Sequence, residues 1–315
     1  MNDRELIYVK TIADKKSISK AAEKLYIAQP SLSQALQKIE EKIGTPLFLR
    51  NANGMELTYA GEMYYKTATE ILNIYNDFTN EVTYVNDLKK GRVTFGITNF
   101  MGTFLLPILL PKFKEKFPNI EVYIKEENST NLEKQISDGT IDFALMHKHP
   151  LIDEKSIKYD NLYTDPFVIA TPCNHALSKY KKNDTKFRYP RIDLNLFMDE
   201  NFIFLDKNKR IRQVTDIILN IAGINPTPNL TLKNHETARR LVSTGFGVML
   251  MPMQYIEIFN DNYNDKYKAD YYIIDKNKYA YWHSCVATNP NMYLSKAAEV
   301  FIDLVHEYYE VGQPI

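Results

Sequence analysis

Residues 17–36, SISKAAEKLYIAQPSLSQAL, have the spacing of two short helices joined by a three-residue turn. Ser17 is suited to cap the first helix, whose apolar residues recur every three or four positions. The second helix opens at Gln29 with Pro30 in its first turn, where the missing N–H costs nothing. This pattern predicts a helix-turn-helix, although an ordinary pair of surface helices has the same spacing.

The second helix leaves short polar side chains on its outward side. They are Gln29, Ser31, Ser33, Gln34, Gln37 and Lys38. Such side chains at the start of a helix can reach base edges in the major groove, so we expect double-stranded DNA as a partner. The candidate DNA contacts are Ser17, Ser19, Gln29, Pro30, Ser31, Ser33, Gln34, Lys38, Arg50 and Asn53.

A hairpin is expected directly after the second helix. Asn53 and Gly54 lie between the short apolar runs of residues 45–58, and an Asn-Gly pair in that setting predicts a tight turn. A hairpin in this place is a wing, and it would bring Arg50 beside the phosphate backbone or the minor groove. Residues 1–58 are therefore expected to form a winged helix-turn-helix domain.

Five motifs of this region occur in the order and spacing of a known family. They are Ser17-Ile18-Ser19-Lys20-Ala21-Ala22-Glu23-Lys24-Leu25, Gln29-Pro30-Ser31-Leu32-Ser33, Ile39-Glu40-Glu41-Lys42-Ile43-Gly44, Leu47-Phe48 and Leu57-Thr58-Tyr59-Ala60-Gly61. In these motifs the chain resembles the LysR-type transcriptional regulators. It departs mildly at Ile18, where the family usually has Phe, and at Ala28, where the family usually has a hydroxyl-bearing cap. The resemblance implies a winged helix-turn-helix, a linker helix that dimerises, and a two-lobed α/β effector domain of the periplasmic-binding-protein type.

Composition excludes binding to nucleic acid by bulk charge. The chain has 39 Lys and Arg against 39 Asp and Glu, and residues 1–60 have nine against seven, a net charge of +2. DNA binding must then rely on individually placed contacts and on dimer symmetry. No apolar run reaches the roughly 18 residues of a membrane-spanning helix, and residues 1–5 do not begin a signal peptide. We therefore expect a cytoplasmic protein with no membrane partner.

A heptad pattern follows the expected wing. Residues 58–89 contain no proline, and apolar residues recur there at alternating intervals of four and three. The seam is Tyr64, Ala68, Ile71, Tyr75, Phe78, Val82 and Val85. A stripe this narrow favours pairing with another long helix, although packing on the chain's own domain remains an alternative. We expect residues 59–90 to form a linker helix through which the chain self-associates as a dimer or tetramer.

Residues 91–315 alternate short apolar runs with helical segments, which predicts α/β layers with parallel strands. The resemblance implies two lobes, lobe I at about residues 91–162 and 269–315 and lobe II at about residues 163–268. The expected strands are 92–98, 121–126, 141–147, 167–171, 202–205, 229–232, 247–251, 271–274 and 284–288. The expected helices are 102–117 with interruptions at Pro107 and Pro111, 129–138, 210–222, 235–244 and 291–309.

In such layers a ligand binds where strands end and helices begin. Ser129 is expected to cap the helix after the second strand, where its hydroxyl and the free N–H groups can receive an anion. We therefore expect a small anionic effector, most simply a carboxylate. Its candidate contacts are Thr98, Asn99, Met101, Ser129, His147, Phe204 and Thr237. The cations of residues 207–210 either join this site or lie on a solvated face, and the solvated face is favoured because cations oppose the dipole at a helix N-terminus.

Motifs for catalysis and metal binding are missing from the sequence. Cys173 and Cys285 lie far apart and outside any C-x-x-C motif, so we expect buried, inert thiols rather than a redox pair. Residues 235–239 and 306–310 lack the second histidine of a zinc helix, and His147-Lys148-His149 lacks a third ligand nearby. We expect no catalytic residues, no metal and no cofactor. A metabolite-processing enzyme with an appended DNA-binding head remains the alternative.

Overall fold

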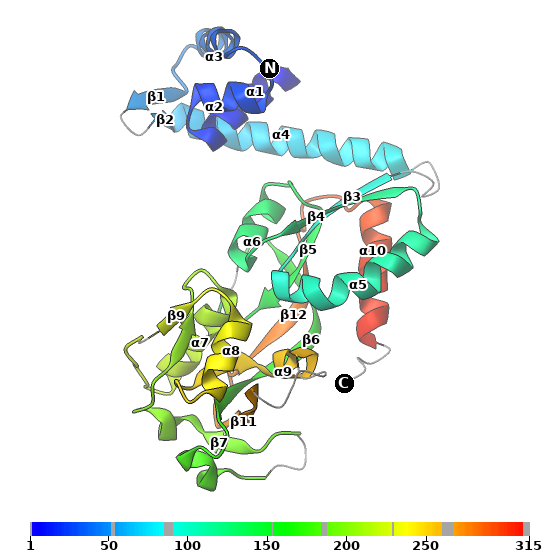
Figure 1. Ribbon diagram of the computed structural model, residues 1–315. Helices are drawn as coiled ribbons and strands as arrows, with labels where there is room; N and C mark the ends of the chain where they lie inside the picture. Colours follow the sequence, from blue (N-terminus) through cyan, green and yellow to red (C-terminus); the bar gives the residue numbers. More distant parts are fainter. Residues whose placement is uncertain are drawn as a thin grey trace. The chain divides into compact units, whose positions relative to one another are not determined.

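The computed structural model describes residues 2–51, 54–84, 91–152, 154–183, 188–228, 230–259 and 267–310 (Figure 1). The chain divides into two compact units, Met1–Asp87 with Met292–Ser295, and Leu88–Asn291 with Lys296–Ile315. Within the described ranges, no helix has both the length and the apolar character needed to span a bilayer.

The N-terminal unit starts with α1 (Asp3–Lys15), α2 (Ile18–Lys24) and α3 (Gln29–Ile43). Ser17 caps α2 as predicted, because its hydroxyl accepts a hydrogen bond from the Lys20 N–H at 3.4 Å. Ala28 precedes α3 and provides no side-chain cap. Gly44 ends α3 with a φ of 82°, a left-handed conformation that glycine adopts without steric cost. The apolar sides of the three helices form one core.

The wing consists of β1 (Phe48–Asn51) and β2 (Gly54–Leu57), paired antiparallel. The Met55 N–H donates to the carbonyl oxygen of Lys16 at 2.9 Å, which fastens the wing to the end of α1. Gly54 has a φ of 113°, and a Cβ there would overlap the same carbonyl oxygen. Asn53 lies outside the described residues, so its place in the turn stays a prediction.

The long helix α4 (Tyr59–Tyr84) follows the wing. Thr58 caps it by accepting a hydrogen bond from the Gly61 N–H at 3.0 Å. Tyr64 and Ala68 are buried in the core of the N-terminal unit, because the first turns of α4 run along α1. The predicted seam is therefore wrong for these two positions. The seam residues Ile71, Tyr75 and Phe78 are exposed together with Ile74, whereas the Val82 side chain and Val85 lie outside the described part.

The second unit begins with β3 (Gly91–Ile97), α5 (Asn99–Lys116), β4 (Ile120–Glu126), α6 (Ser129–Ser137) and β5 (Phe143–Lys148). The three strands pair in parallel in the order β4-β3-β5. Helix α5 starts earlier than predicted and runs unbroken through Pro107 and Pro111. Proline lacks the N–H of an intrahelical hydrogen bond and its ring crowds the preceding turn, but its φ stays near the helical value, so such a residue can bend a helix without ending it.

The long strand β6 (Lys158–Pro172) joins two lobes. Its first part pairs antiparallel with β12 (Tyr281–Thr288), which also pairs with β5. From Phe167 onward it pairs instead with β10 (Met249–Pro252) and β11 (Ala269–Asp275). The first lobe comprises the elements from β3 to β5 with β12 and α10 (Lys296–Glu310), and the second comprises the elements between β6 and β12.

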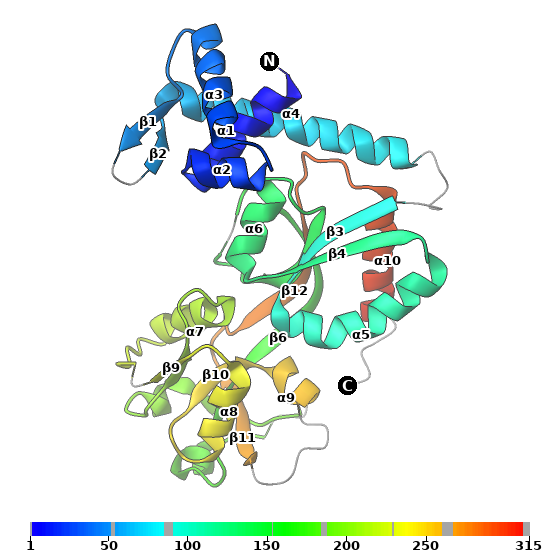
Figure 2. The same cartoon turned by 45° about the horizontal axis from the view of Figure 1, so that its top comes forward.

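The remaining elements of the second lobe are β7 (Arg191–Asp193), β8 (Ile203–Leu205), α7 (Arg210–Ile221), β9 (Leu230–Leu232), α8 (His235–Ser243) and α9 (Met253–Phe259), with short 3₁₀ turns at Ala176–Tyr180 and Leu194–Phe197. Strands β8 and β9 pair in parallel, which brings the starts of α7 and α8 together. In the first lobe, α5 and α10 cover one face of the sheet and α6 lies on the other (Figure 2). Phe301 of α10 packs between Phe95 and Phe113.

The two cysteines have different environments. Cys285 is buried in β12, where burial raises the pKa of its thiol to about 12, as expected for an inert thiol. Cys173 is exposed, so the prediction of a buried thiol is wrong there. The reason is that β6 ends at Pro172 and leaves Cys173 in the following turn.

Candidate functional site

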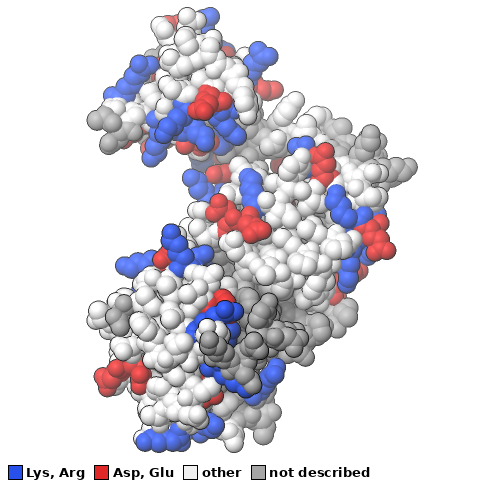
Figure 3. Space-filling view, viewed as in Figure 1, with Lys and Arg blue, Asp and Glu red and all other residues white. Residues whose placement is uncertain are grey.

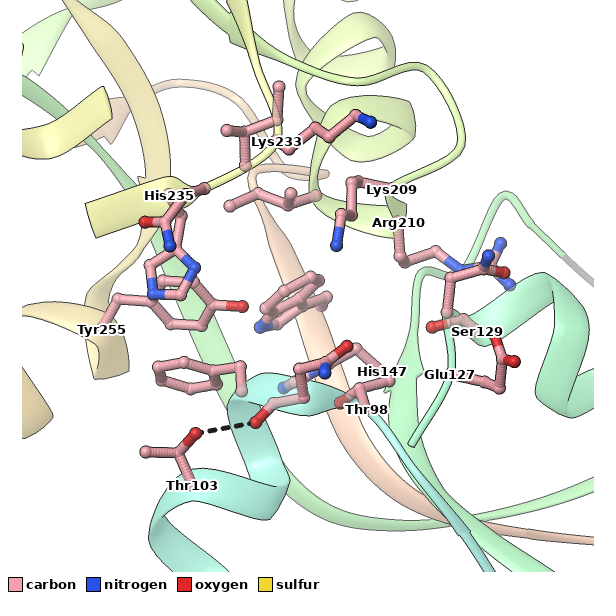
Figure 4. A pocket seen from close by; sticks show the side chains of 17 residues that line it. Thr98, Thr103, Glu127, Ser129, His147, Lys209, Arg210, Lys233, His235 and Tyr255 are labelled. Carbon is pink, nitrogen blue, oxygen red and sulfur yellow. Dashed lines mark hydrogen bonds between the residues drawn. The ribbon is translucent and has the colours of Figure 1, made fainter. Parts of the chain in front are cut away.

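A cavity of about 430 Å³ lies between the two lobes of the second unit (Figure 4). Its walls come from the residues that follow β3, β4, β8 and β9, from the end of β5, and from α9 and β12. This is the position expected for a ligand in α/β layers, where strands end and helices begin.

Four helices begin at the cavity. The first residues of α5, α6, α7 and α8, which are Asn99, Ser129, Arg210 and His235, all line it. Helices α5 and α7 have no side-chain hydrogen bond at their N-caps. Helix N-termini carry partial positive charge and unpaired N–H groups, so their convergence favours an anion in the cavity.

The cap of α6 is Asn128 rather than Ser129. The Asn128 side chain accepts a hydrogen bond from the Asn131 N–H at 2.9 Å, and Ser129 is the first residue inside the helix. The predicted capping role of Ser129 is therefore wrong, because the helix begins one residue earlier than that role requires. Ser129 is nevertheless buried and lines the cavity, so its hydroxyl is a candidate ligand contact.

Three cations of the second lobe, Lys209, Arg210 and Lys233, line the cavity, opposite one carboxylate of the first lobe, Glu127 (Figure 4). The side chain of Arg210 is only 5% exposed, and its guanidinium forms an ion pair with Glu133 on α6. This ion pair therefore links the two lobes.

The preference for a solvated face at residues 207–210 is wrong for Arg210, and Arg212 just beyond is buried as well. The Arg212 Nε donates to Asp216 at 2.7 Å, and its Nη1 donates to the Leu205 carbonyl oxygen at 3.1 Å. The positive charges of both guanidinium groups are compensated by acceptors that the fold places beside them. A buried charge is tolerated only with such partners. Lys207 is exposed, as predicted.

Aromatic rings form the base of the cavity. The imidazole of His147 stacks on Trp282 with ring centroids 3.8 Å apart, and Phe100 of α5 stacks on Tyr255 of α9. Burial, together with the charge of Arg210, lowers the pKa of His147 to about 3. Burial also lowers the pKa of His235 to about 4. Both imidazoles are therefore neutral near pH 7.

Two polar atoms in the first-lobe wall have no hydrogen-bond partner among the described residues. They are the Thr98 hydroxyl oxygen and the His147 Nε2, and both are buried. Native proteins pair nearly all buried polar atoms, so exceptions require an explanation. A ligand in the cavity would supply one.

The structure brings four of the seven predicted effector contacts to the cavity, namely Thr98, Asn99, Ser129 and His147. It does not bring the other three there. Met101 is buried in the core, Phe204 lies beneath the guanidinium of Arg212, and Thr237 is exposed in the first turn of α8.

The sequence analysis missed several cavity residues from distant segments. They include Phe100, Glu127, Lys233, His235, Tyr255 and Trp282. Lys209, which also lines the cavity, belongs to the basic run 207–210 for which the sequence left a place in the site open. His235 could have been found by the rule that selected Ser129, because it opens the helix that follows β9. Tyr255 lies on α9, which the sequence analysis did not predict.

The candidate DNA-contacting residues have unequal exposure. Gln29, Pro30, Ser31, Gln34, Lys38, Ser19 and Arg50 are exposed, whereas Ser33 and Ser17 are half-buried. In the turn before α3, Tyr26 is 95% exposed and has a φ of 55°. Lys and Arg side chains are spread over the N-terminal unit on the face shown in Figure 3.

Comparison with known proteins assigns both units. Residues 4–62 match the bacterial regulatory helix-turn-helix protein of the lysR family, and residues 86–310 match the LysR substrate binding domain. The chain belongs to the LysR family. This LysR protein is 29% identical to YcgK, an uncharacterized HTH-type transcriptional regulator of Bacillus subtilis (strain 168), over 80% of each chain.

Solved structures share the LysR fold of this chain. A full-length OxyR variant from Pseudomonas aeruginosa superposes with a TM-score of 0.66 at 21% identity, covering 99% of this chain and 95% of that one. The effector binding domain of QuiR in complex with shikimate superposes with a TM-score of 0.57 at 20% identity, covering 71% of this chain and 99% of that one.

The predicted resemblance and fold class are therefore confirmed: a helix-turn-helix, the long helix α4 and a mixed α/β effector-binding domain. LysR proteins are DNA-binding transcriptional regulators and not enzymes, which decides between the two functions that the sequence left open. They are typically oligomeric.

Proposed function

We propose that this LysR regulator reads operator DNA through α3 and the wing, and that a small anion bound between the lobes controls this activity. The convergence of four helix N-termini and three cations on one cavity is the observation that supports the anion. We propose that the protein acts in the cytoplasm, where it binds its operator DNA.

The DNA-binding proposal rests on the exposed side of α3. Gln29, Ser31 and Gln34 occupy its first two turns, and their amides and hydroxyl can each donate and accept hydrogen bonds at base edges. Arg50 on β1 is exposed at the wing, where a guanidinium suits a phosphate contact. Ser17 differs from the other candidate DNA contacts, because its hydroxyl already caps α2. We propose that this hydroxyl acts by holding the start of α2 in place.

The charge of the cavity favours an anionic effector. Lys209 and Lys233 add positive charge to the helix N-termini, while His147 and His235 are neutral and Glu127 is the single carboxylate among the described lining residues. A volume of about 430 Å³ suits a small organic molecule. We propose Thr98, Asn99, Ser129, His147, Lys209 and Lys233 as effector contacts.

The position of the cavity suggests how the effector acts. Its walls come from both lobes, so a ligand that contacts both walls binds one lobe arrangement more tightly than another. That difference in affinity is the free energy available to change how paired DNA-binding domains sit on an operator.

Self-association through α4 would pair these domains. Ile71, Ile74, Tyr75 and Phe78 form an exposed apolar stripe on the second half of α4. Exposed apolar patches of this kind mark interaction surfaces, and a second copy of the same helix matches the heptad spacing. We propose that the chain forms a dimer through this stripe, or a tetramer built from such dimers.

The effector proposal is tested by thermal unfolding of the intact protein with small carboxylates and with the matching neutral amides. A ligand that binds only the folded protein raises the melting temperature, so carboxylates should raise it and amides should not. Ligands found in this way should also change the affinity for a DNA duplex selected from a random library. A cationic or neutral ligand that binds more tightly than every anion would contradict the proposal.

A further inference from the structure

We propose that the effector is a hydroxycarboxylate that bridges the cavity, with its carboxylate on the second lobe and its hydroxyl against Thr98 and His147 of the first lobe. This inference rests on the proposed function, because it divides the same cavity into two subsites. It also reverses the expectation from sequence that the first lobe receives the anion.

The first-lobe subsite suits an uncharged polar group. The Thr98 hydroxyl and the His147 Nε2 are buried and without partners among the described residues. His147 is 2% exposed, and its ring is held in place by Trp282. A hydroxyl and a neutral imidazole can each donate or accept a hydrogen bond, depending on rotamer and tautomer, and a ligand hydroxyl can do the same. One ligand hydroxyl could therefore pair both atoms.

A charged group fits this subsite less well. The burial that keeps His147 neutral also penalises an ionised group of a ligand beside it, and the carboxylate of Glu127 lies on the same wall. A dicarboxylate would bring its second charge toward Glu127. An ammonium group of a ligand would be attracted by the carboxylate of Glu127. The Glu127 Oε2, however, already accepts a hydrogen bond from the Asn131 side chain at 3.0 Å.

The second-lobe subsite suits the carboxylate. Lys209 and Lys233 lie beside the starts of α7 and α8, and both helix starts line the cavity. The carboxylates that compensate the neighbouring arginines, Glu133 and Asp216, contact Arg210 and Arg212. An anion here gains both from the ammonium groups and from the N-terminal ends of the helices.

The ligand class is tested by calorimetry and thermal unfolding of the intact protein with matched sets. One set is lactate, propionate, alanine and lactamide. Two larger sets are mandelate, phenylacetate, phenylglycine and mandelamide, and 3-hydroxybenzoate, benzoate, 3-aminobenzoate and 3-hydroxybenzamide. In the set whose size fits, the hydroxy acid should bind at least about tenfold more tightly than the acid without the hydroxyl and than the amide.

Variants assign the two ends of the ligand. Lys233→Gln should weaken the hydroxy acid and the acid without the hydroxyl by the same factor, because both lose a cation. Thr98→Val, and His147→Phe with its ring still able to stack on Trp282, should weaken only the hydroxy acid. Lys207→Gln is the matched control, because Lys207 belongs to the same basic run, is exposed and does not line the cavity.

The outcomes separate this inference from the proposed function. Equal binding of acids with and without the hydroxyl, or tighter binding of the amino acid, would overturn the hydroxycarboxylate while leaving an anionic effector in place. An effect of Thr98→Val equal on both acids would overturn the division into subsites. Failure of every acid in the three sets to bind would contradict the anionic effector and with it this inference.

Discussion

The indole of Trp282 lies against the imidazole of His147, with ring centroids 3.8 Å apart and ring planes 14° apart. The Trp282 Nε1 donates to the carboxylate of Asp165 at 3.0 Å, and the same carboxylate accepts the Gln254 N–H at the start of α9. Asp165 lies on β6 just before that strand passes from one lobe to the other. Trp282 is the single tryptophan of the chain, so its fluorescence reports on the cavity and on the crossover together.

The low pKa of His147 predicts a loss of stability in acid. Burial lowers its pKa in the folded protein to about 3, whereas the unfolded chain has the ordinary value of about 6.5. Between these values the unfolded state binds a proton that the folded state does not, so stability falls as pH drops below 6.5. The slope should be about 1.4 kcal/mol per pH unit from this residue.

Urea unfolding between pH 7 and pH 5, followed by Trp282 fluorescence, measures this slope. The His147→Phe variant cannot titrate at this position and should lose that part of the slope, although His235, whose pKa is also lowered, adds its own contribution in both proteins. Identical slopes for the two proteins would show that His147 does not titrate as described.

Substitutions on α3 and on the wing should affect DNA binding differently. Gln29→Ala removes a candidate base contact and should cost about 1 to 3 kcal/mol on a selected duplex while leaving random duplexes nearly unaffected. Arg50→Ala removes a candidate phosphate contact, so it should weaken all sequences alike and reduce the salt dependence. Fluorescence anisotropy at several salt concentrations distinguishes these effects. Equal losses on selected and random duplexes for both variants would refute the assigned roles.

A charge on the exposed stripe of α4 should weaken self-association. Phe78→Lys or Ile71→Lys places an ammonium in the proposed helix pair and should raise the dissociation constant at least about tenfold. Asn76→Lys is the matched control, since Asn76 is exposed on another side of the same helix. Analytical ultracentrifugation gives the result, and an unchanged assembly in Phe78→Lys would mean that the stripe does not hold the chains together.

Two glycines near the wing should differ in their tolerance of alanine. A Cβ on Gly61 would overlap the carbonyl oxygen of Leu47, whereas no atom lies within 4 Å of a Cβ on Gly44. Gly61→Ala should therefore destabilise the N-terminal unit by about 1 to 3 kcal/mol or more through overpacking. Gly44→Ala should cost about 1 to 2 kcal/mol, from its φ of 82° alone. Thermal loss of operator binding ranks the two, and the reverse order would contradict the role given to Gly61.

Local patterns predicted the N-terminal unit well because its interactions are close in sequence. Ser17 caps α2 through Lys20, three residues away, and Gly44 ends the helix that precedes it. The first half of β6 was missed for the opposite reason. Residues 158–166 are largely polar, and they become a strand only by pairing with β12, more than a hundred residues later.

The sequence by itself determined the helix-turn-helix, the wing and the long helix α4, because caps, turns and apolar spacing act over a few residues. The class of regulator followed from the resemblance of its motifs to a known family. Only the tertiary structure decided the chemistry of the cavity. Arg210 is buried because Glu133 reaches it from the other lobe, and His147 is neutral because Trp282 and the surrounding core exclude water from its ring. Burial and charge compensation depend on which distant segments come into contact. Short-range sequence patterns do not reveal those contacts.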